Sequence, residues 1–237
     1  MISSNHPSAF RIHPSSFTLH PFAFPCNACV GKILPKNKIY EHGSPSASIK
    51  ESFVKDIEKI IWAYKLSPET INVPANGFVQ EIQIFKVILK KESIKDETLA
   101  VIDKSIPSPI LYEIIFNNKF RYAAAYKRQS ESDKTKWVVS SYFYTSWFSE
   151  DTQRSPIPIA LDLQTLYETL IANILPIRSR QNENIIELVA RAERIEMKNR
   201  EAAQLEISMN REKQFNRKVE LNSELRKLKQ EIKELSL

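Results

Sequence analysis

The segment from Asn182 to Leu237 constrains the fold of this 237-residue chain most strongly, because it contains neither proline nor glycine. Apolar residues recur along it every three or four positions, which places them on one face of a helix. They form two runs, the first made of Ile185, Leu188, Ala192, Ile195 and Ala202 and the second of Leu221, Leu225, Leu228, Ile232 and Leu235. Ala202 and Leu221 are nineteen positions apart, two heptads plus five, so the runs are out of register. We expect either one long helix with a slipped stripe or two helices that bend back around Ser208–Phe215.

Cations concentrate in the second half of this segment. Seven of them occur within nineteen residues that hold only three acidic residues, Glu212, Glu220 and Glu224. The seven are Arg211, Lys213, Arg217, Lys218, Arg226, Lys227 and Lys229. A basic stripe on a helix can bind nucleic-acid phosphates or an acidic partner surface. The same residue types are also common on the solvated flanks of coiled coils, so both interpretations stay open.

The composition excludes several classes of protein. With 3 glycines, the chain cannot build a Gly-rich phosphate-binding loop. Its 2 cysteines are too few for a disulfide scaffold and fit a reducing compartment. No apolar run reaches the ~18 residues that span a bilayer, and the N-terminus lacks the pattern of a signal peptide. We therefore expect a cytoplasmic protein without a membrane partner, whose net charge of +6 permits an acidic partner but does not require one.

Residues 1–24 are predicted to be a disordered, low-complexity tail. A His-Pro pair recurs with a period of seven residues, at His6, His13 and His20. Proline at this spacing interrupts a helix, and a histidine-rich metal tract is the alternative interpretation. We favour a tail that is not part of the working protein. All 4 histidines lie in the first 42 residues, so the rest of the chain has no imidazole for catalysis.

Residues 25–176 are predicted to form an α+β domain. Apolar residues at helical spacing indicate helices, and runs rich in Ile, Val and aromatic residues indicate strands. The predicted helices cover residues 49–65, 96–106 and 161–175. The predicted strands cover residues 81–90, 110–116, 120–127 and 137–144, with a hairpin turn at Asn117-Asn118-Lys119. This order favours a mixed or antiparallel sheet of about four strands with packed helices. A long helical, coiled-coil-like arm over residues 177–237 follows.

Charged residues in the predicted strands raise the question of a magnesium-dependent nuclease. Glu81 and Glu113 interrupt apolar strands, and Lys127 ends another. Such enzymes place carboxylates and a lysine at a sheet edge to hold Mg²⁺ and polarise the attacking water. The usual carboxylate-x-Lys pair is missing here, and solvent-facing positions on a half-buried sheet explain the same pattern. We predict no catalytic residue and keep the nuclease as an alternative.

Two further patterns have ordinary structural explanations. Cys26-x-x-Cys29 could supply half of a zinc site, but no second pair follows to complete four ligands. Aromatic residues are dense between Tyr126 and Phe148. They could stack on single-stranded nucleic acid, although alternate rings in a strand more often pack in the core. We predict no metal site and no cofactor.

Five segments together resemble one family. They are Leu34–Glu41, Ile61–Asn72, Glu81–Phe85, Val101–Pro107 and Lys213–Asn222. In this order, from about Cys29 to the C-terminus, they resemble the bacterial family catalogued as domain of unknown function 4391. The resemblance implies no reaction, because members are described as uncharacterised. It implies an association with DNA methyltransferase and helicase genes of restriction-type defence loci.

The interpretation that we favour is a non-catalytic interaction or accessory protein. Its arm is expected to pair with itself or with a protein partner, and the resemblance suggests a DNA-modifying assembly of the restriction type. Two alternatives remain. One is a divergent nuclease that uses Glu81, Glu113 and Lys127. The other is direct nucleic-acid binding by the seven cations of the arm.

Overall fold

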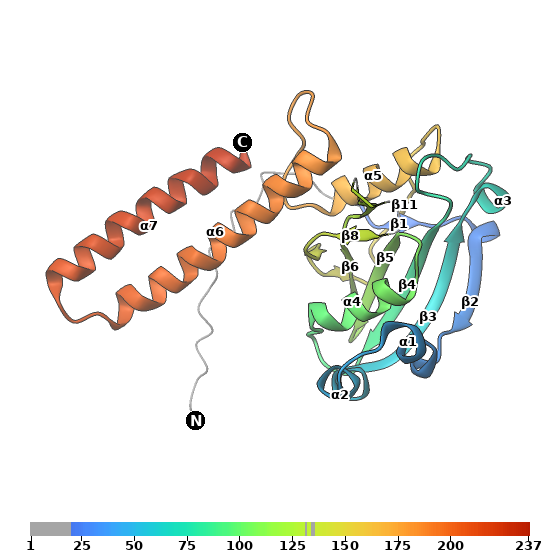
Figure 1. Cartoon of the computed structure of the whole chain (residues 1–237), viewed down its shortest axis with the longest axis horizontal. Helices are drawn as coiled ribbons and strands as arrows, with labels where there is room; N and C mark the ends of the chain where they lie inside the picture. Colours follow the sequence, from blue (N-terminus) through green and yellow to red (C-terminus); the bar gives the residue numbers. More distant parts are fainter. Residues whose placement is uncertain (1–19, 131, 134–135) are drawn as a thin grey trace. The chain divides into compact units, whose positions relative to one another are not determined.

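Figure 1 shows the computed structural model, which describes residues 20–130, 132–133 and 136–237. The chain divides into two units, here called the body and the arm. The body ends at Leu175, and the arm begins at Pro176. This division lies one residue from the boundary predicted after residue 176. Most of the predicted tail, residues 1–19, lies outside the described residues.

The body is built on a mixed sheet of seven strands among the described residues, in the order β10-β6-β5-β4-β3-β2, with β9 also paired to β6. These strands are β2 (Cys29–Ile33), β3 (Ile57–Leu66), β4 (Ile82–Leu89), β5 (Ile110–Phe116), β6 (Lys119–Ala124), β9 (Phe143–Tyr144) and β10 (Phe148–Ser149). In this sheet β4 and β5 run parallel, because helix α4 (Asp96–Ser105) forms the crossover between them. The other neighbours are antiparallel. The α+β class is confirmed, but the sheet has more strands than the four predicted.

Two small sheets complete the strands of the body. The strands β1 (Phe22–Ala23) and β11 (Ser155–Pro156) pair in parallel, and β7 (Lys127–Gln129) pairs antiparallel with β8 (Trp137–Val139). The predicted strand over 137–144 is therefore divided between β8 and β9. Strand β1 corrects the predicted start of the body at residue 25. Phe22 is only 4% exposed, and its backbone N–H donates to the Tyr122 hydroxyl at 2.9 Å.

The predicted helix over residues 49–65 is wrong in its second half. Helix α2 (Ala47–Asp56) begins at the Ser46 cap and ends at Asp56, and β3 continues the chain from Ile57. The apolar residues of β3 have helical spacing because its register with β4 shifts twice, between Ile57 and Lys59 and between Trp62 and Tyr64. Such bulges remove the strict alternation by which a strand is recognised. The β-branched and aromatic side chains of this run favour the strand.

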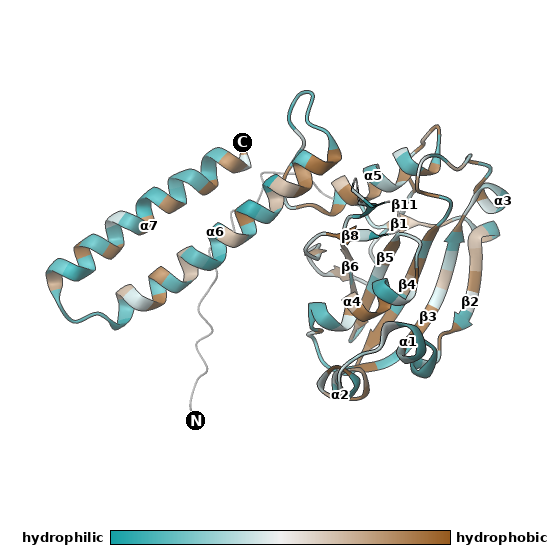
Figure 2. Cartoon of the chain, viewed as in Figure 1, coloured by the Kyte–Doolittle hydropathy of each residue, from teal (hydrophilic) through white to brown (hydrophobic). Residues whose placement is uncertain are grey.

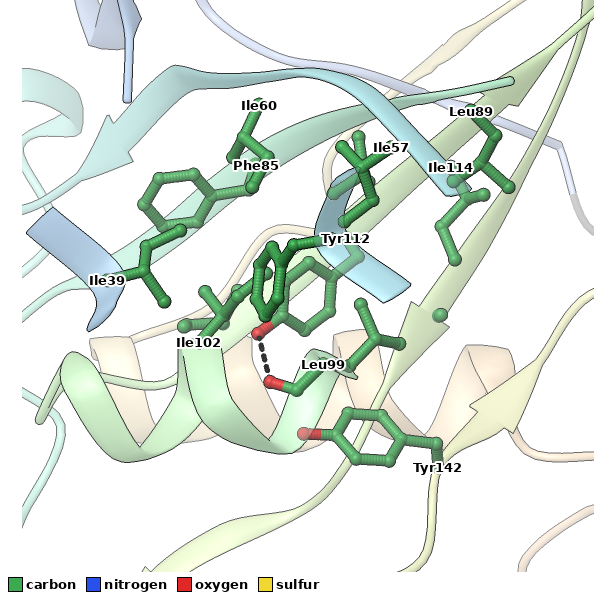
Figure 3. Close-up of a cluster of buried hydrophobic side chains, with 14 of the residues drawn as sticks. Ile39, Ile57, Ile60, Phe85, Leu89, Leu99, Ile102, Tyr112, Ile114 and Tyr142 are labelled. Carbon is green, nitrogen blue, oxygen red and sulfur yellow. Dashed lines mark hydrogen bonds between the residues drawn. The ribbon is translucent and has the colours of Figure 1, made fainter. Parts of the chain in front are cut away.

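Helices α1 (Lys36–Gly43), α2 and α4 cover one face of the sheet (Figure 1). Figure 3 shows the core that they form, in which Ile39 and Leu99 from these helices meet Phe85 and Tyr112 from the sheet. Phe53 of α2 belongs to the same cluster. Each buried side chain of this kind contributes about 1.5–3 kcal/mol to folding. The body also contains a 3-10 turn and two further helices, η1 (Cys26–Ala28), α3 (Pro68–Ile71) and α5 (Leu163–Ile174).

The arm is a hairpin of two helices, α6 (Ile185–Arg211) and α7 (Phe215–Ser236). Asn184 begins α6 with a capping box that includes Glu187. At the turn, the Glu212 carboxylate accepts the backbone N–H groups of Lys213 and Gln214 at 2.7 and 2.8 Å. Of the two arrangements that the sequence allowed, the structure has the one that bends back around Ser208–Phe215. Among the described residues, no helix combines the length and hydropathy needed to cross a membrane.

Candidate functional site

The inner seam of the hairpin is apolar and closed. Leu221, Leu225, Leu228 and Ile232 of α7 are buried, each at 7% exposure or less. On α6, Ile195 and Ala202 are buried as well. Figure 2 shows hydrophobic positions recurring along both helices between hydrophilic ones. The predicted stripe therefore packs within one chain, and the hairpin needs no partner to cover it.

Ion pairs join the two helices on both sides of the seam. Lys229 Nζ lies 2.7 Å from Glu206 Oε1, and Lys198 pairs with Glu231. Lys229 and Glu231 are two residues apart, about 200° around α7, so these two pairs lie on different flanks of the hairpin. They fix which residues of α7 lie on which flank.

At the base of the hairpin, buried Arg191 ties both helices to the preceding loop. Its Nε donates to Glu183 Oε1 at 2.6 Å, and its Nη1 donates to the Leu235 carbonyl, near the end of α7, at 2.7 Å. The hydrogen bond from Arg191 lowers the pKa of the Glu183 carboxyl. The end of α7 is therefore held by charge as well as by the seam.

At the opposite end, the tip of the hairpin exposes large apolar side chains. Phe215 is 77% exposed, Val219 is 53% exposed and Ile207 is 40% exposed. Arg211 and Lys213, two of the predicted cations, are exposed beside them at the turn. Large exposed apolar groups that are rimmed by polar residues are typical of interaction surfaces. We call Phe215 and Val219, which lie one turn apart on α7, the tip patch.

The cations of α7 are sorted by flank. Successive helical residues are rotated by about 100°, so residues three, four, seven or eleven apart share a side. On this basis the flank of the Lys229–Glu206 pair carries four cations. We call them the basic flank: Lys218, Arg226, Lys229 and Lys233. The flank of the Lys198–Glu231 pair carries Glu220, Glu224 and Glu231, here called the acidic flank.

The structure thus divides the seven predicted cations. Lys218, Arg226 and Lys229 belong to the basic flank, and Arg211 and Lys213 lie at the turn. Two others lie toward the acidic flank. Arg217 pairs with Glu220 at 2.7 Å. Lys227 lies three residues after Glu224 and four before Glu231, on the same side of the helix. Sequence reasoning missed Lys233 and the tip patch. No signal in the sequence marked Phe215 as exposed.

The structure does not bring the predicted nuclease residues together. Lys86 of β4 is paired in register with Glu113 of β5, on the face opposite the core residues Phe85 and Tyr112. Gln83 lies on the same face as Phe85, because alternate residues of a strand share a face. Gln83 donates a hydrogen bond to Glu81 at 2.7 Å, which places Glu81 on this core side as well. Glu81 and Glu113 therefore occupy opposite faces of the sheet.

Each of these carboxylates has its own partners. Glu81 pairs with Lys65 at 2.9 Å and accepts from the Ser108 hydroxyl at 2.9 Å. Glu113 is 1% exposed and binds Arg154 through both oxygens, at 2.8 and 3.3 Å. Carboxylates that are neutralised by Lys and Arg in this way are poor ligands for Mg²⁺, which binds carboxylates freed for the metal.

Lys127 serves as a buried cap. Its Nζ donates to the Asp103 carbonyl at 2.7 Å and to the Ile106 carbonyl, both at the C-terminal end of α4. Burial lowers the pKa of this lysine. The Asp103 carboxylate accepts hydrogen bonds from Tyr112, at 3.0 Å, and from Tyr142. Burial raises the pKa of Asp103 to about 6.

The two other patterns found in the sequence lie apart from these groups. Cys26 and Cys29 are exposed, in η1 and at the start of β2. Within the described part of the chain, no group of three or more His, Cys, Asp and Glu residues is placed to hold a metal ion. Of the aromatic residues, Tyr126, Tyr142 and Phe143 are buried in the body.

Comparison with known proteins gives one match. A family model described as "Domain of unknown function (DUF4391)" matches residues 22–232. The chain belongs to this family. No curated protein and no solved structure matches the chain.

The limits of the DUF4391 match agree with the structure at both ends. It begins at Phe22, the buried residue whose N–H binds Tyr122, and it ends at Ile232, the last buried residue of the seam. The DUF4391 region therefore includes the helical hairpin as well as the body. The resemblance described above is confirmed, and it extends seven residues further toward the N-terminus than Cys29.

Proposed function

We propose that this DUF4391 protein is a non-catalytic interaction protein whose hairpin arm docks onto a partner protein. The observation that carries this proposal is the exposure of Phe215 at 77% on the tip of a hairpin whose own seam is closed. Phe215 and Val219 do not stabilise the seam, and leaving them in water gains nothing for folding. Aromatic side chains that are buried by a partner commonly dominate the binding energy of an interface.

The state of the body supports the same function. Glu81, Glu113 and Lys127, the residues of the alternative nuclease interpretation, each belong to a separate network of ion pairs or hydrogen bonds. We propose that the body is not catalytic and that the arm binds the partner. The first partners to test are DNA methyltransferase and helicase subunits of restriction-type assemblies, the class suggested by the family resemblance.

A paired capture experiment tests the proposal. Tagged full-length protein is compared with a Phe215→Ser/Val219→Ser variant and with a matched Asn216→Ser/Ser223→Ala control, which changes two exposed polar residues of α7. We expect the tip variant to lose a partner that the wild type and the control retain. The partner must then rebind when purified. Equal capture by all three proteins would contradict docking through the tip.

Light scattering separates a foreign partner from a second copy. A molar mass that rises with concentration in the wild type and not in the tip variant would assign the tip to self-association. A monomer that retains no partner would end the proposal.

A further inference from the structure

Helix α7 separates its charges around its axis, and the apolar tip lies on only one of the two sides. The basic flank consists of Lys218, Arg226, Lys229 and Lys233. Lys218, Arg226 and Lys233 are exposed, and the Lys229 side chain is 37% exposed. Phe215 lies three residues before Lys218, and Val219 lies seven before Arg226. Both apolar residues therefore lie toward the basic flank.

The opposite flank of α7 has the reverse sign. Glu220, Glu224 and Glu231 repeat at intervals of four and seven residues. Lys227 and the Arg217–Glu220 pair accompany them, so this flank contains compensated cations. A ligand with negative charge is attracted to one side of α7 and repelled by the carboxylates of the other.

The geometry points to the basic flank, together with Phe215 and Val219, as the docking face for an acidic amphipathic segment of a partner protein. This inference rests on the proposed function and specifies the face and the partner class. From Lys218 to Lys233 the flank extends ~22 Å, about four helical turns. The fitting segment carries Asp or Glu residues along a similar length and an apolar side chain at the end that meets the tip.

A protein segment fits this face better than a nucleic acid does. Phe215 and Val219 have no counterpart on a phosphate backbone, whereas an apolar side chain of a peptide can bury them. The facing helix also contributes a carboxylate, since Glu206 pairs with Lys229 at 2.7 Å. The affinity of a duplex grows with the number of phosphates that cations neutralise, and this flank offers only four cations, one of them already paired. Charge complementarity along one flank instead selects a partner and its orientation.

Two charge-reversal variants provide the test. Lys218→Glu/Arg226→Glu reverses two cations of the basic flank. Arg217→Glu/Lys227→Glu makes the same change in charge at the adjacent positions, on the acidic flank. All four side chains are exposed, so circular dichroism is expected to show both variants folded. The comparison cancels the effect of total charge.

The probe is a fluorescein-labelled 22-residue helical peptide of Glu, Ala and Leu, with Glu on one face and a Leu-Phe pair at one end. Fluorescence anisotropy measures its binding to the full-length protein. A peptide with Gln in place of Glu and a 20-base-pair DNA duplex serve as controls. We expect the acidic peptide to bind, and the basic-flank variant to weaken that binding by about tenfold or more. The acidic-flank variant should keep its affinity within about twofold, and the Gln peptide should bind weakly.

Three results would overturn this inference. Equal losses in the two variants would show that total charge decides the binding. Tighter binding of the duplex, lost in the basic-flank variant, would assign the flank to nucleic acid. Failure of the acidic peptide to bind would leave the flank without its predicted partner. The proposed function is judged separately: if Phe215→Ser/Val219→Ser abolishes partner capture while Lys218→Glu/Arg226→Glu does not, docking holds and the basic flank is excluded.

Discussion

Arg154 and Glu113 form an ion pair with two contacts, in which Nη2 lies 2.8 Å from Oε1 and Nη1 lies 3.3 Å from Oε2. Arg154 Nη1 also donates to the Phe22 carbonyl at 3.2 Å, and its guanidinium lies 4.2 Å from the Phe120 ring centroid. One side chain therefore connects β5, β6 and the N-terminal strand.

Replacing Glu113 by Gln is expected to lower the free energy of unfolding by about 3 kcal/mol, because Arg154 loses the charged partner that offsets its desolvation. Urea denaturation measures this change, with Glu58→Gln as an exposed control. Glu113→Leu/Arg154→Met should restore much of the loss. A single variant as stable as the control would show that the ion pair contributes nothing.

The buried Asp103 predicts an unusual dependence of stability on pH. Its pKa is about 6 in the folded state, raised by burial, whereas an unfolded Asp titrates near ~3.9. The folded state thus holds the proton more tightly. Protonated Asp103 therefore contributes to the free energy of unfolding. This contribution is fully present below pH ~4 and is lost as the pH rises through about 6, a change of about 3 kcal/mol.

Asp103→Asn removes this titration while keeping an acceptor for Tyr112 and Tyr142. We expect the difference in unfolding free energy between wild type and variant to shift in favour of the variant from pH 4 to pH 7. Thermal and urea denaturation across this range measure it. A difference that stays constant with pH would exclude Asp103 as the titrating group.

Gly43 determines how closely α1 approaches α4. A Cβ at this position would lie 2.6 Å from Val101 Cγ1 and 2.8 Å from the Val101 carbonyl oxygen. Gly43→Ala should therefore cost about 1–3 kcal/mol of stability by overpacking. Gly31 provides a contrast, because a Cβ there meets open space and only the left-handed φ of +66° opposes it. Gly31→Ala should cost about 1–2 kcal/mol, and urea denaturation compares the two variants.

Loss of Arg191 is expected to let the C-terminal end of α7 open locally. Replacing it by Met removes the hydrogen bonds to Glu183 and to the Leu235 carbonyl, so the last turns of α7 should exchange their amide hydrogens faster. Arg191→Lys retains the charge but cannot reproduce the planar fork, so it should rescue little. Mass spectrometry of hydrogen exchange compares these peptides with those of β4, which should not change.

Local chemistry made part of this fold predictable. The β5–β6 hairpin was recognised because Asn117 and Asn118 tolerate the left-handed backbone, and their φ values are 45° and 58°. Predicted elements at 96–106 and 161–175 correspond to α4 and α5, where one apolar face is buried throughout. β3 was half missed because two register shifts give a strand the spacing of a helix.

The candidate sites were less predictable than the fold, since they depend on contacts between distant residues. The separation of Glu113 and Arg154 is 41 residues, and no spacing rule connects them. The seven cations were found by their density in the sequence. Assigning each of them to a flank required knowing which side of α7 faces the seam. Exposure of Phe215 could not be read from the sequence, because the position of the turn decides which apolar residues enter the seam.

The turn of the arm contains no glycine or proline, and the Glu212 carboxylate caps it. The backbone N–H groups of Gln214 and Lys213 lower the pKa of Glu212 and bind its carboxylate. Straightening this hinge would lose that cap and free both halves of the seam. A straightened chain could then recover the same leucine contacts from another molecule in a reciprocal exchange of α7. The direction of the chain at Glu212–Gln214 therefore separates a self-contained hairpin from an interlocked pair of chains.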